Sequence, residues 1–302
     1  MKNTNEIAAK FLGKDSLNNK IASYNAPEKI DSSLLVAIPR SLNRESHGID
    51  QNSFIGFDTW NCYELSTINA KGKPFVGIMK IYFPSSSTNI VESKSLKLYL
   101  NSFNLCRLES VTYEDIIHEL QTIITNDLIT KIEDTNIKVK VYNANTIDLI
   151  RSPISHSDFE NIDDLDIEVG TSSTAILDNE IHSHIKILKI HSTLLRSNCR
   201  VTNQPDWGDV YIHIEAKKLP TKESLLKYII SMRKEQHFHE EICESIYHNL
   251  LIKFEPQRLL VQCLYTRRGG IDINPIRYTK NMIGYEVLNY FSNNRIYKTN
   301  RQ

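Results

Sequence analysis

Residues 57–83 read FDTWNCYELSTINAKGKPFVGIMKIYF, and this stretch decides the fold class. Its pattern predicts two strands, Phe57–Ser66 and Phe75–Phe83. Between them, residues 69–74 contain a glycine and a proline, which favour a turn. We therefore interpret the stretch as a β-hairpin.

Two helical patterns follow this hairpin. The first covers residues 93–103 and the second residues 113–131, where apolar side chains recur at helical spacing and Thr112 is placed to cap the helix. A strand pattern at residues 137–142 comes next. The chain lacks the regular alternation of a doubly wound sheet, and it contains neither GxGxxG nor a P-loop motif. The sequence therefore predicts an α+β protein.

The second half of the chain repeats this order of elements. Strand patterns at residues 198–202 and 209–215 come first, and Thr221 then opens a helix. A second helix starts near His239, and residues 259–265 are predicted to form a strand. The order matches the first half, which indicates a tandem repeat.

Local sequence also supports the repeat and locates its boundary. The pair Asn61-Cys62 is echoed by Asn198-Cys199. Residues 158–168 are acidic and contain no basic residue, which is typical of a solvated connector. We predict a boundary near residue 165, with one module at residues 1–165 and the other at 166–302.

The composition is that of a globular protein without a strong electric field. The chain has 302 residues, of which 40% are hydrophobic, and its 36 Lys plus Arg balance 36 Asp plus Glu. Zero net charge argues against direct nucleic-acid binding and against attraction to a membrane. There is no apolar run of about 18 residues and no secretory signal pattern, so we expect a cytoplasmic protein.

The cysteines argue against a disulfide framework and against a structural zinc site. Their number is odd, they are far apart, and no CxxC motif occurs, so we expect reduced thiols and no bound metal. The five residues are Cys62, Cys106, Cys199, Cys243 and Cys263.

Cys199 and Asp206 are candidates for a nucleophile and its proton donor. Cys199 ends a predicted strand, and Asp206 follows in a turn with the sequence Gln-Pro-Asp-Trp-Gly. The two side chains would meet if the turn folds back, and Arg200 would stabilise a thiolate if it faces the sulfur. The alternative is a buried structural thiol beside a turn-forming aspartate.

The break between the two C-terminal helices carries Phe238-His239-Glu240. The imidazole of His239 can move protons near neutral pH, and Glu240 can accept paired N–H donors from a heterocycle. The alternative is that Glu240 complements the helix dipole and His239 caps the helix. We interpret five other histidines of this half, which stand in no metal-ligand register, as core or surface residues: His182, His184, His191, His213 and His237.

Two further segments are candidates for binding phosphate. Glu92-Ser93-Lys94-Ser95 lies at a helix start, where backbone N–H groups, hydroxyls and an ammonium gather, and Glu92 can also bind a base edge. Residues 265–270, Tyr-Thr-Arg-Arg-Gly-Gly, supply two guanidiniums and flexible backbone after a strand. The alternatives are a solvated helix start and a turn with exposed arginines.

Together these segments resemble one family, the NADPH-dependent 7-cyano-7-deazaguanine reductases of queuosine biosynthesis, in their long, two-module form. The likeness runs from about residue 12 to residue 278, and it includes the similar stretch VAIPRSLNR at residues 36–44. Four separated motifs carry it in the same order as in the family: ESKSLKLYLNSFN at 92–104, SNC with QPDWG at 197–208, FHE at 238–240 and YTRRGGIDINP at 265–275.

The resemblance implies an architecture and an assembly. The family has a tandem tunnelling fold (T-fold), in which antiparallel sheets carry helices on one face, and this form is usually a homodimer. Cys62 takes the position equivalent to Cys199 in the first half. It lacks a following QPDWG-like turn, so we predict that it is structural.

The resemblance also implies the roles of site residues. Cys199 matches the nucleophile and Asp206 the proton-transferring acid. The remaining matches are to residues that hold ligands. Those for the substrate are Val91, Glu92, Ser93, Phe238, His239 and Glu240, and those for NADPH are Ser93, Lys94, Arg268 and Gly269.

The implied reaction suits these residue types. A thiolate that adds to a nitrile gives a thioimide, which accepts hydride more readily once its nitrogen is protonated. Loss of the thiolate then leaves an imine for a second reduction by NADPH, and the site must exclude water meanwhile. The helix break near His239 is a candidate lid element.

Three alternatives to this function stay open at this stage. A zinc-dependent cyclohydrolase of the same superfold would need Cys and His in ligand spacing, which the sequence lacks. An inactive pterin- or purine-binding subunit would have no need for Cys199, Asp206, His239 and Glu240 together. Direct binding of tRNA is disfavoured by the neutral charge.

Overall fold

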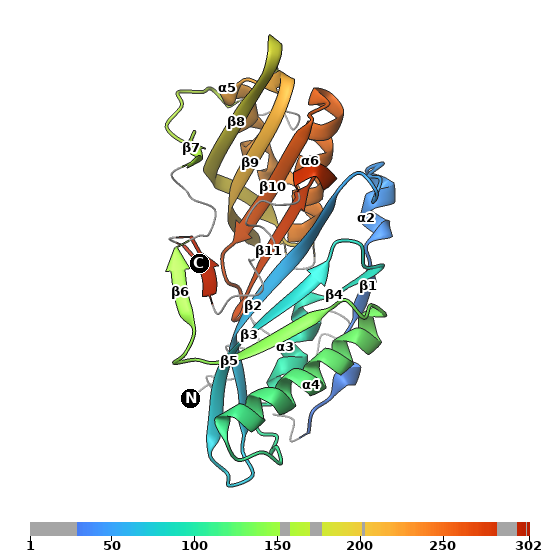
Figure 1. Cartoon of the computed structure of the whole chain (residues 1–302), viewed down its shortest axis with the longest axis vertical. Coiled ribbons are helices and arrows are strands. Elements are labelled where there is room, and N and C mark those ends of the chain that lie inside the picture. The colour runs from blue at the N-terminus through green and yellow to red at the C-terminus, as the bar shows by residue number, and fades with distance from the viewer. Residues whose placement is uncertain (1–28, 152–157, 170–176, 201–202, 283–294, 300) are drawn as a thin grey trace, which may run out of the picture.

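The computed structural model describes residues 29–151, 158–169, 177–200, 203–282, 295–299 and 301–302. Its main feature is a long mixed sheet (Figure 1). In spatial order the strands are β5 (Lys138–Asn143), β3 (Pro74–Pro84), β2 (Ile55–Ile68), β11 (Ile271–Tyr278), β10 (Arg258–Tyr265), β9 (Pro205–Pro220), β8 (Asn179–Asn198) and β7 (Glu160–Asn161). Neighbouring strands are antiparallel except β7 and β8, which are parallel.

Shorter elements complete the chain. Two small sheets pair β1 (Ala37–Pro39) with β4 (Asn89–Val91), and β6 (Asp148–Arg151) with β12 (Arg295–Lys298). The α-helices are α2 (Ser41–Ser46), α3 (Ser93–Asn101), α4 (Tyr113–Ile132), α5 (Lys222–Ser231) and α6 (His239–Phe254), and short 3-10 helices are η1 (Ser32–Leu34), η3 (Met232–Lys234) and η4 (Lys280–Met282). Among the described helices, none has the length and apolar character needed to cross a membrane.

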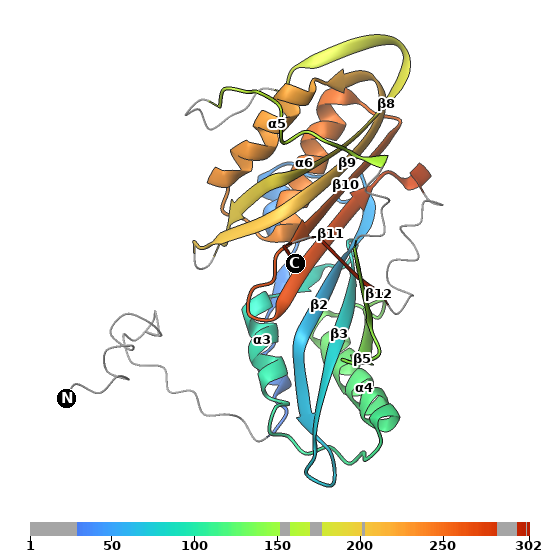
Figure 2. The ribbon, with the colours of Figure 1, turned by 90° about the vertical axis from the view of Figure 1, so that its left-hand side faces the viewer.

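The order of elements is the same in the two halves of the chain. A hairpin, β2–β3 or β8–β9, is followed by two helices, α3–α4 or α5–α6, and then by β5 or by β10 and β11. The two hairpins lie in one continuous sheet because β11 pairs with β2 along its whole length, from Ile271 opposite Cys62 to Tyr278 opposite Ile55 (Figure 2). The last long strand of the C-terminal half, β11, therefore lies beside β2, the first long strand of the N-terminal half.

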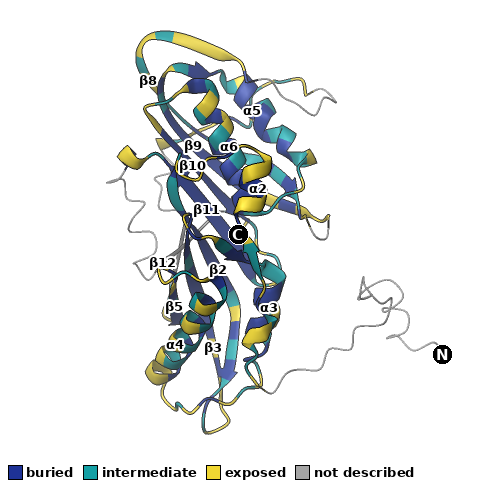
Figure 3. Cartoon of the chain, turned by 90° about the vertical axis from the view of Figure 1, so that its right-hand side faces the viewer, coloured by how far each residue is buried: buried dark blue, intermediate teal, exposed yellow. Residues whose placement is uncertain are grey.

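Each pair of helices buries an apolar face on the strands of its own half. Trp60, Met79 and Ile81 pack against α3 and α4, while Ile212, Val261 and Cys263 pack against α5 and α6. The outer faces of the helices are exposed (Figure 3). Each core also includes side chains from the other half, and a third cluster, with Phe57, Leu260 and Ile276, spans the junction, so burial of apolar surface also joins the two halves.

Local capping fixes where the helices begin, as the sequence predicts. The hydroxyl of Thr112 accepts a hydrogen bond from the Asp115 N–H at 3.1 Å, and that of Thr221 accepts one from the Ser224 N–H at 3.2 Å. The predicted hairpin and the helices of both halves are confirmed, with boundaries within a few residues of the expected ones.

Two predictions about the second half are wrong. The strand expected at residues 198–202 instead ends at Asn198, since the chain turns after this residue; residues 201–202 lie outside the described part. The acidic segment at 158–168 is not a solvated connector throughout. Ile162 is fully buried, and the Asp163 carboxylate accepts hydrogen bonds from Ser192 and Thr193, which fixes the segment against β8.

Candidate active site

A pocket lies where the two halves of the chain meet. Its walls come from the end of β4 and the start of α3 in the N-terminal half, and from the β8–β9 turn, the start of α6 and the end of β10 in the C-terminal half. The pocket brings together ten of the eleven predicted site residues, Val91, Glu92, Ser93, Lys94, Cys199, Asp206, Phe238, His239, Glu240 and Arg268. Gly269, the eleventh, lines an adjoining hollow that shares Lys97 and Ile271 with the pocket.

The β8–β9 turn brings Cys199 and Asp206 to the same end of a hairpin. Ser197 of β8 is paired with Asp206 of β9, and the Cys199 N–H donates to the Gln204 carbonyl at 2.8 Å. The turn therefore folds back, as a catalytic pair would require. Cys199 is 8% exposed and Asp206 is 3% exposed, and both line the pocket.

The cation beside the Cys199 sulfur is Lys94. Its Nζ lies 3.5 Å from the sulfur although the two residues are 105 positions apart in the sequence. A nearby ammonium favours the thiolate form of a cysteine. Arg200, which would stabilise a thiolate only if it faced the sulfur, instead pairs through its guanidinium with Glu241 at 3.2 Å and with His237 at 3.2 Å.

Glu92 caps α3 with one carboxylate oxygen and leaves the other available. Its Oε2 accepts from the Ser95 N–H at 2.7 Å, whereas Oε1 is buried and has no hydrogen-bond partner among the residues that the structure describes. This oxygen lies 3.7 Å from Lys94 Nζ. The backbone of Glu92 is held in turn by its N–H, which donates to the Val36 carbonyl at 2.8 Å.

Glu240 lies on the opposite wall of the pocket, in the first turn of α6. The turn is fixed by Glu241, whose side chain accepts from the Phe238 N–H at 2.9 Å. Glu240 is 6% exposed, and its Oε1 also lacks a hydrogen-bond partner within the described chain. Burial, reinforced by the charge of Asp58, raises the pKa of Glu240 to about 8. Such a carboxyl group is costly to bury without a partner, which indicates a ligand-binding role.

His239 is neutral at pH 7. Burial lowers the pKa of its imidazole to about 4, and the carboxylate of Asp206 offsets this only in part. Its Nε2 lies 3.8 Å from the Asp206 Oδ1, and its ring packs edge-on against Tyr265 with 4.1 Å between ring centres. The lowered pKa argues against proton transfer by a titrating His239 near neutral pH, and the neutral ring can donate or accept a hydrogen bond.

Arg268 and Gly269 lie in the turn between β10 and β11, facing the start of α3. The Arg268 guanidinium contacts the carboxylate of Asp206 and the side-chain oxygen of Gln204. Gly269 has a φ of +56°, which favours glycine, whereas a Cβ there would meet only the flexible end of the Lys97 side chain, at 3.1 Å from its Cδ. Lys94, Lys97 and Arg268 together make this side of the pocket positively charged.

Cys62 differs from Cys199 in its surroundings, although it lines the hollow that adjoins the pocket and lies near Lys97. It lies within β2, opposite Met79 of β3, and is 1% exposed. Burial raises the pKa of its thiol, and the charge of Asp272 raises it further. A thiol of this kind is unreactive, as predicted for a structural residue.

Sequence reasoning missed several residues that line the pocket. Most lie beside or within the predicted motifs, such as Ile90 before Val91, but their types are ordinary for a core or a surface; His237, which we interpreted as a core or surface residue, lines the pocket. Lys97 was detectable, because it lies one helical turn after Ser93 and Lys94 and so shares their face of α3. The others are Ile38, Trp60, Ile90, His237, Thr266, Ile271 and Ile273. Within the described ranges no group of three His, Cys, Asp or Glu side chains is arranged to hold a metal ion.

Comparison with known proteins gives the family. The model of a family described as "Nitrile reductase, 7-cyano-7-deazaguanine-reductase N-term" matches residues 26–141, and one described as "QueF-like protein" matches residues 205–282. A protein of Hahella chejuensis named NADPH-dependent 7-cyano-7-deazaguanine reductase is 42% identical over 254 residues, which cover 83% of this chain and 89% of that protein. The chain belongs to the 7-cyano-7-deazaguanine reductase family.

Other relatives extend this result. Reductases of the same name from Rickettsia felis and Rickettsia canadensis are 42% and 41% identical, and they cover 87% and 90% of this chain and 93% of each relative. A solved structure, the archaeosine synthase QueF-Like in its apo form, is similar to 32% of this chain with 17% identity and a TM-score of 0.28. Family membership confirms the resemblance inferred from the four sequence motifs.

Proposed function

We propose that this member of the 7-cyano-7-deazaguanine reductase family uses NADPH to reduce the nitrile of 7-cyano-7-deazaguanine to an aminomethyl group, through a covalent adduct on Cys199, in queuosine biosynthesis. The observation that carries the proposal is the position of the Cys199 sulfur, which lies beside an ammonium group in a pocket that also contains Asp206. The pocket is bounded by two carboxyl groups, those of Glu92 and Glu240, that each have an oxygen without a hydrogen-bond partner in the described structure.

The two carboxylates suit the substrate. The aminopyrimidinone edge of a deazaguanine presents adjacent N–H donors, and a carboxylate is their natural acceptor. In this proposal Glu92 and Glu240 bind the base from opposite walls. Phe238 and His239 contact its ring, and the backbone around Val91 and Ser93 borders it, as the lining of the pocket allows.

Cys199 and Asp206 carry the chemistry in this proposal. The Cys199 thiolate, favoured by Lys94, adds to the nitrile carbon, and Asp206 delivers a proton to the nitrile nitrogen to give a thioimide. After the first reduction, the adduct expels the thiolate and leaves an imine. Burial of both residues helps to keep water away from that imine.

The residues at the start of α3 and in the β10–β11 turn fit NADPH. Ser93 offers a hydroxyl at a helix start, Lys94 and Arg268 offer positive charge, and Gly269 leaves backbone accessible, all of which suit phosphate groups. When bound, NADPH supplies the hydride for each of the two reductions. The contacts of Arg268 with Asp206 and Gln204 show that this guanidinium already faces the pocket.

We further propose that the chain is a tandem T-fold protein with modules at 1–165 and 166–302, that it forms a homodimer, and that it acts in the cytoplasm without binding nucleic acid directly. The repeated order of hairpin and helices in the two halves supports the tandem modules. The two family models also match on either side of residue 165. Sedimentation of the purified protein tests the dimer.

A mass measurement tests the covalent step. The protein is mixed with the nitrile base without NADPH, and its intact mass and peptides are then determined. We expect a mass gain equal to that of the base, located on Cys199 and absent from Cys199→Ala. Unmodified wild-type protein, under conditions in which the base binds, would contradict the mechanism.

A further inference from the structure

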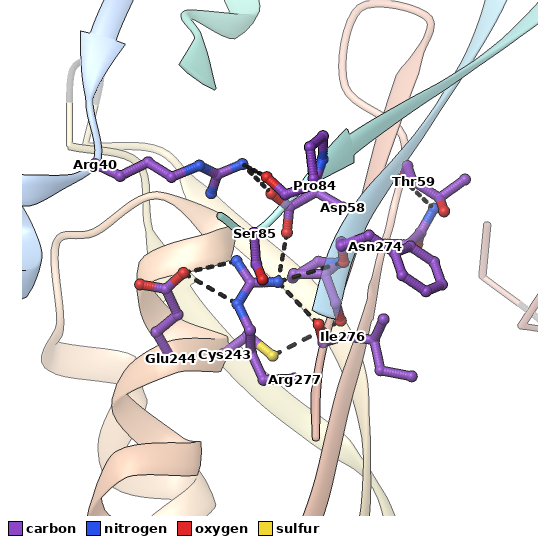
Figure 4. A network of polar contacts seen from close by, with 12 residues as sticks. Arg40, Asp58, Thr59, Pro84, Ser85, Cys243, Glu244, Asn274, Ile276 and Arg277 are labelled. Carbon is purple, nitrogen blue, oxygen red and sulfur yellow. Dashed lines mark hydrogen bonds and ion pairs between the residues drawn. The ribbon is translucent and has the colours of Figure 1, made fainter. Parts of the chain in front are cut away.

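Five charged side chains form a buried network between the two halves of the chain, close to Glu240 of the pocket. Figure 4 shows Arg40, Asp58, Glu244 and Arg277 of this network. We call it the interface network. Its ion pairs are short, and each of its side chains is at most 4% exposed. The members are Arg40, Arg44, Asp58, Glu244 and Arg277.

Glu244 is the centre of the network on the side of the C-terminal half. Arg44 donates to both of its carboxylate oxygens, at 2.9 and 2.7 Å, and Arg277 donates twice to Oε1, at 3.0 and 2.7 Å. Burial opposes ionisation, but the charges of Arg277 and Arg44 lower the pKa of Glu244 to about 2. Glu244 lies one turn after Glu240 on α6, so the same contacts fix the turn that carries Glu240.

Asp58 is the centre of the network on the side of the N-terminal half. Its Oδ1 accepts from Arg277 at 2.7 Å and its Oδ2 from Arg40 at 2.6 Å. Arg40 comes directly after β1, which pairs with β4, and β4 ends immediately before Glu92. Arg40 also donates from its Nε to the Ser87 hydroxyl at 3.1 Å, so it joins the chain after β1 to the chain before β4 at one end of this small sheet.

An unbroken series of ion pairs therefore runs from Arg40 through Asp58, Arg277 and Glu244 to Arg44, and its members are joined to Glu92 and Glu240 through strand pairing and one helical turn. One end, through Arg40 and the β1–β4 sheet, holds the segment of Glu92. The other end, through Glu244, holds the helix of Glu240. The three guanidiniums exceed the two carboxylates by one charge; Asp58 raises the pKa of Glu240, while Arg40 and Arg277 offset this in part.

We propose that the interface network positions Glu92 and Glu240 relative to each other, so that both can bind one flat base. This inference rests on the proposed function, since it names the residues that position the two side chains that bind that substrate. A buried ionic cluster is weak evidence for stability, because the cost of removing its charges from water offsets much of their attraction. The positioning of Glu92 and Glu240 gives this cluster a function beyond any contribution to stability.

The test measures binding of the nitrile base without chemistry. Cys199→Ala is the background, and the dissociation constant of the base is determined by calorimetry. We expect Asp58→Asn to weaken binding about tenfold, because the contacts that join the two halves are lost. NADPH binding to the same variant should change by less than about twofold.

A second variant and a matched control separate positioning from stability. Arg44→Lys keeps the charge but cannot donate to both oxygens of Glu244 in the same geometry, and we expect it to weaken binding of the base about threefold. The control is Asp163→Asn, which removes a hydrogen-bonded carboxylate that does not line the pocket. It should lower the melting temperature without changing the dissociation constant.

The outcomes distinguish this inference from the proposed function. If Asp58→Asn and Arg44→Lys lower the melting temperature but bind the base as tightly as the background, the positioning role is wrong. If Asp58→Asn does not fold, Arg44→Lys alone decides. If the base binds to the wild-type protein but forms no adduct, the covalent mechanism fails, while the effect of the network on binding is still measured.

Discussion

Each half of this chain has an Asn-Cys pair in its hairpin, and the structure places the two cysteines in different surroundings. Cys62 lies inside β2, where the strand continues for several residues and pairs with β3 on one side and β11 on the other. Cys199 follows the last residue of β8, where the chain leaves the sheet and turns back to Asp206. The comparison teaches that reactivity here depends on where the strand ends, since a residue inside a paired strand is covered by both its neighbours and the core.

The halves also differ in what they contribute to the pocket. The N-terminal half supplies a helix start with Glu92, Ser93 and Lys94, and the C-terminal half supplies the thiol, the acid and the first turn of α6. Neither half contains a complete site. The pairing of β2 with β11 is therefore a functional contact as well as a structural one.

The largest expected effect comes from removing each of the two cysteines in turn. Cys199→Ala should reduce turnover by about 10³-fold or more, because no adduct can form. Cys62→Ala should leave turnover within about twofold and lower the free energy of unfolding by about 1–3 kcal/mol, because it removes a buried side chain. Steady-state kinetics and chemical denaturation measure the two effects, and an equal loss of turnover in both variants would refute the distinction.

Asp206 should matter for the reaction far more than for binding. We expect Asp206→Asn to reduce turnover about 10²-fold, because an amide cannot deliver the proton, while the dissociation constant of the base changes by less than about threefold. Single-turnover kinetics and calorimetry provide the two numbers. Parallel losses in both would assign Asp206 to substrate binding instead.

The titration of His239 should be visible in stability. Its pKa is about 4 in the folded protein and about 6.5 when unfolded, so between these values the unfolded chain binds a proton that the folded protein does not. The stability associated with neutral His239 is complete above pH 6.5 and is lost as the pH falls towards 4. When the pH falls from about 6.5 to 4.5, the free energy of unfolding of His239→Gln should therefore decrease by roughly 2 kcal/mol less than that of the wild type.

Urea denaturation of both proteins at several pH values gives this difference. Other groups titrate alike in the two proteins and cancel. Identical pH dependence in wild type and His239→Gln would show that the pKa of the imidazole is not lowered. His239 could then act as a general acid at neutral pH.

The smallest expected effect concerns the carboxylate of the N-terminal half. Glu92→Gln keeps an oxygen that can cap α3 but loses the negative charge, and we expect binding of the base to weaken about tenfold. Glu114→Gln is the control, since Glu114 is exposed in the first turn of α4 and lies outside the pocket. Unchanged binding in Glu92→Gln would leave Glu240 as the main acceptor, and the site would then depend mostly on the C-terminal half.

Much of the fold follows from local sequence. The turn of residues 69–74 and the capping residues Thr112 and Thr221 act over a few positions, and their hairpin and helices form where the pattern predicts. The strand β11 was not predicted. Its sequence contains Pro275 in mid-strand, which argues against a paired strand, and its place in the sheet is set by β2, more than 200 positions earlier.

The site also combines features set by local sequence with features set by distant contacts. The motifs predicted its residues, and the β8–β9 turn brings Cys199 and Asp206 together by local geometry. The neighbour of the sulfur could not be predicted from position, since Arg200 is adjacent in sequence and turns away, while Lys94 reaches it from the other half. The neutral state of His239 likewise results from burial, which no local pattern gives.

Sequence by itself determined the order of the elements, the ends of the helices and the residue types available for chemistry, because these depend on interactions over one or two turns of chain. Only the tertiary structure decided how the two halves pack against each other. The order of strands in the sheet brings Lys94 to Cys199 and joins Asp58 to Arg277, and contacts between such distant residues arise only when the whole sheet has formed.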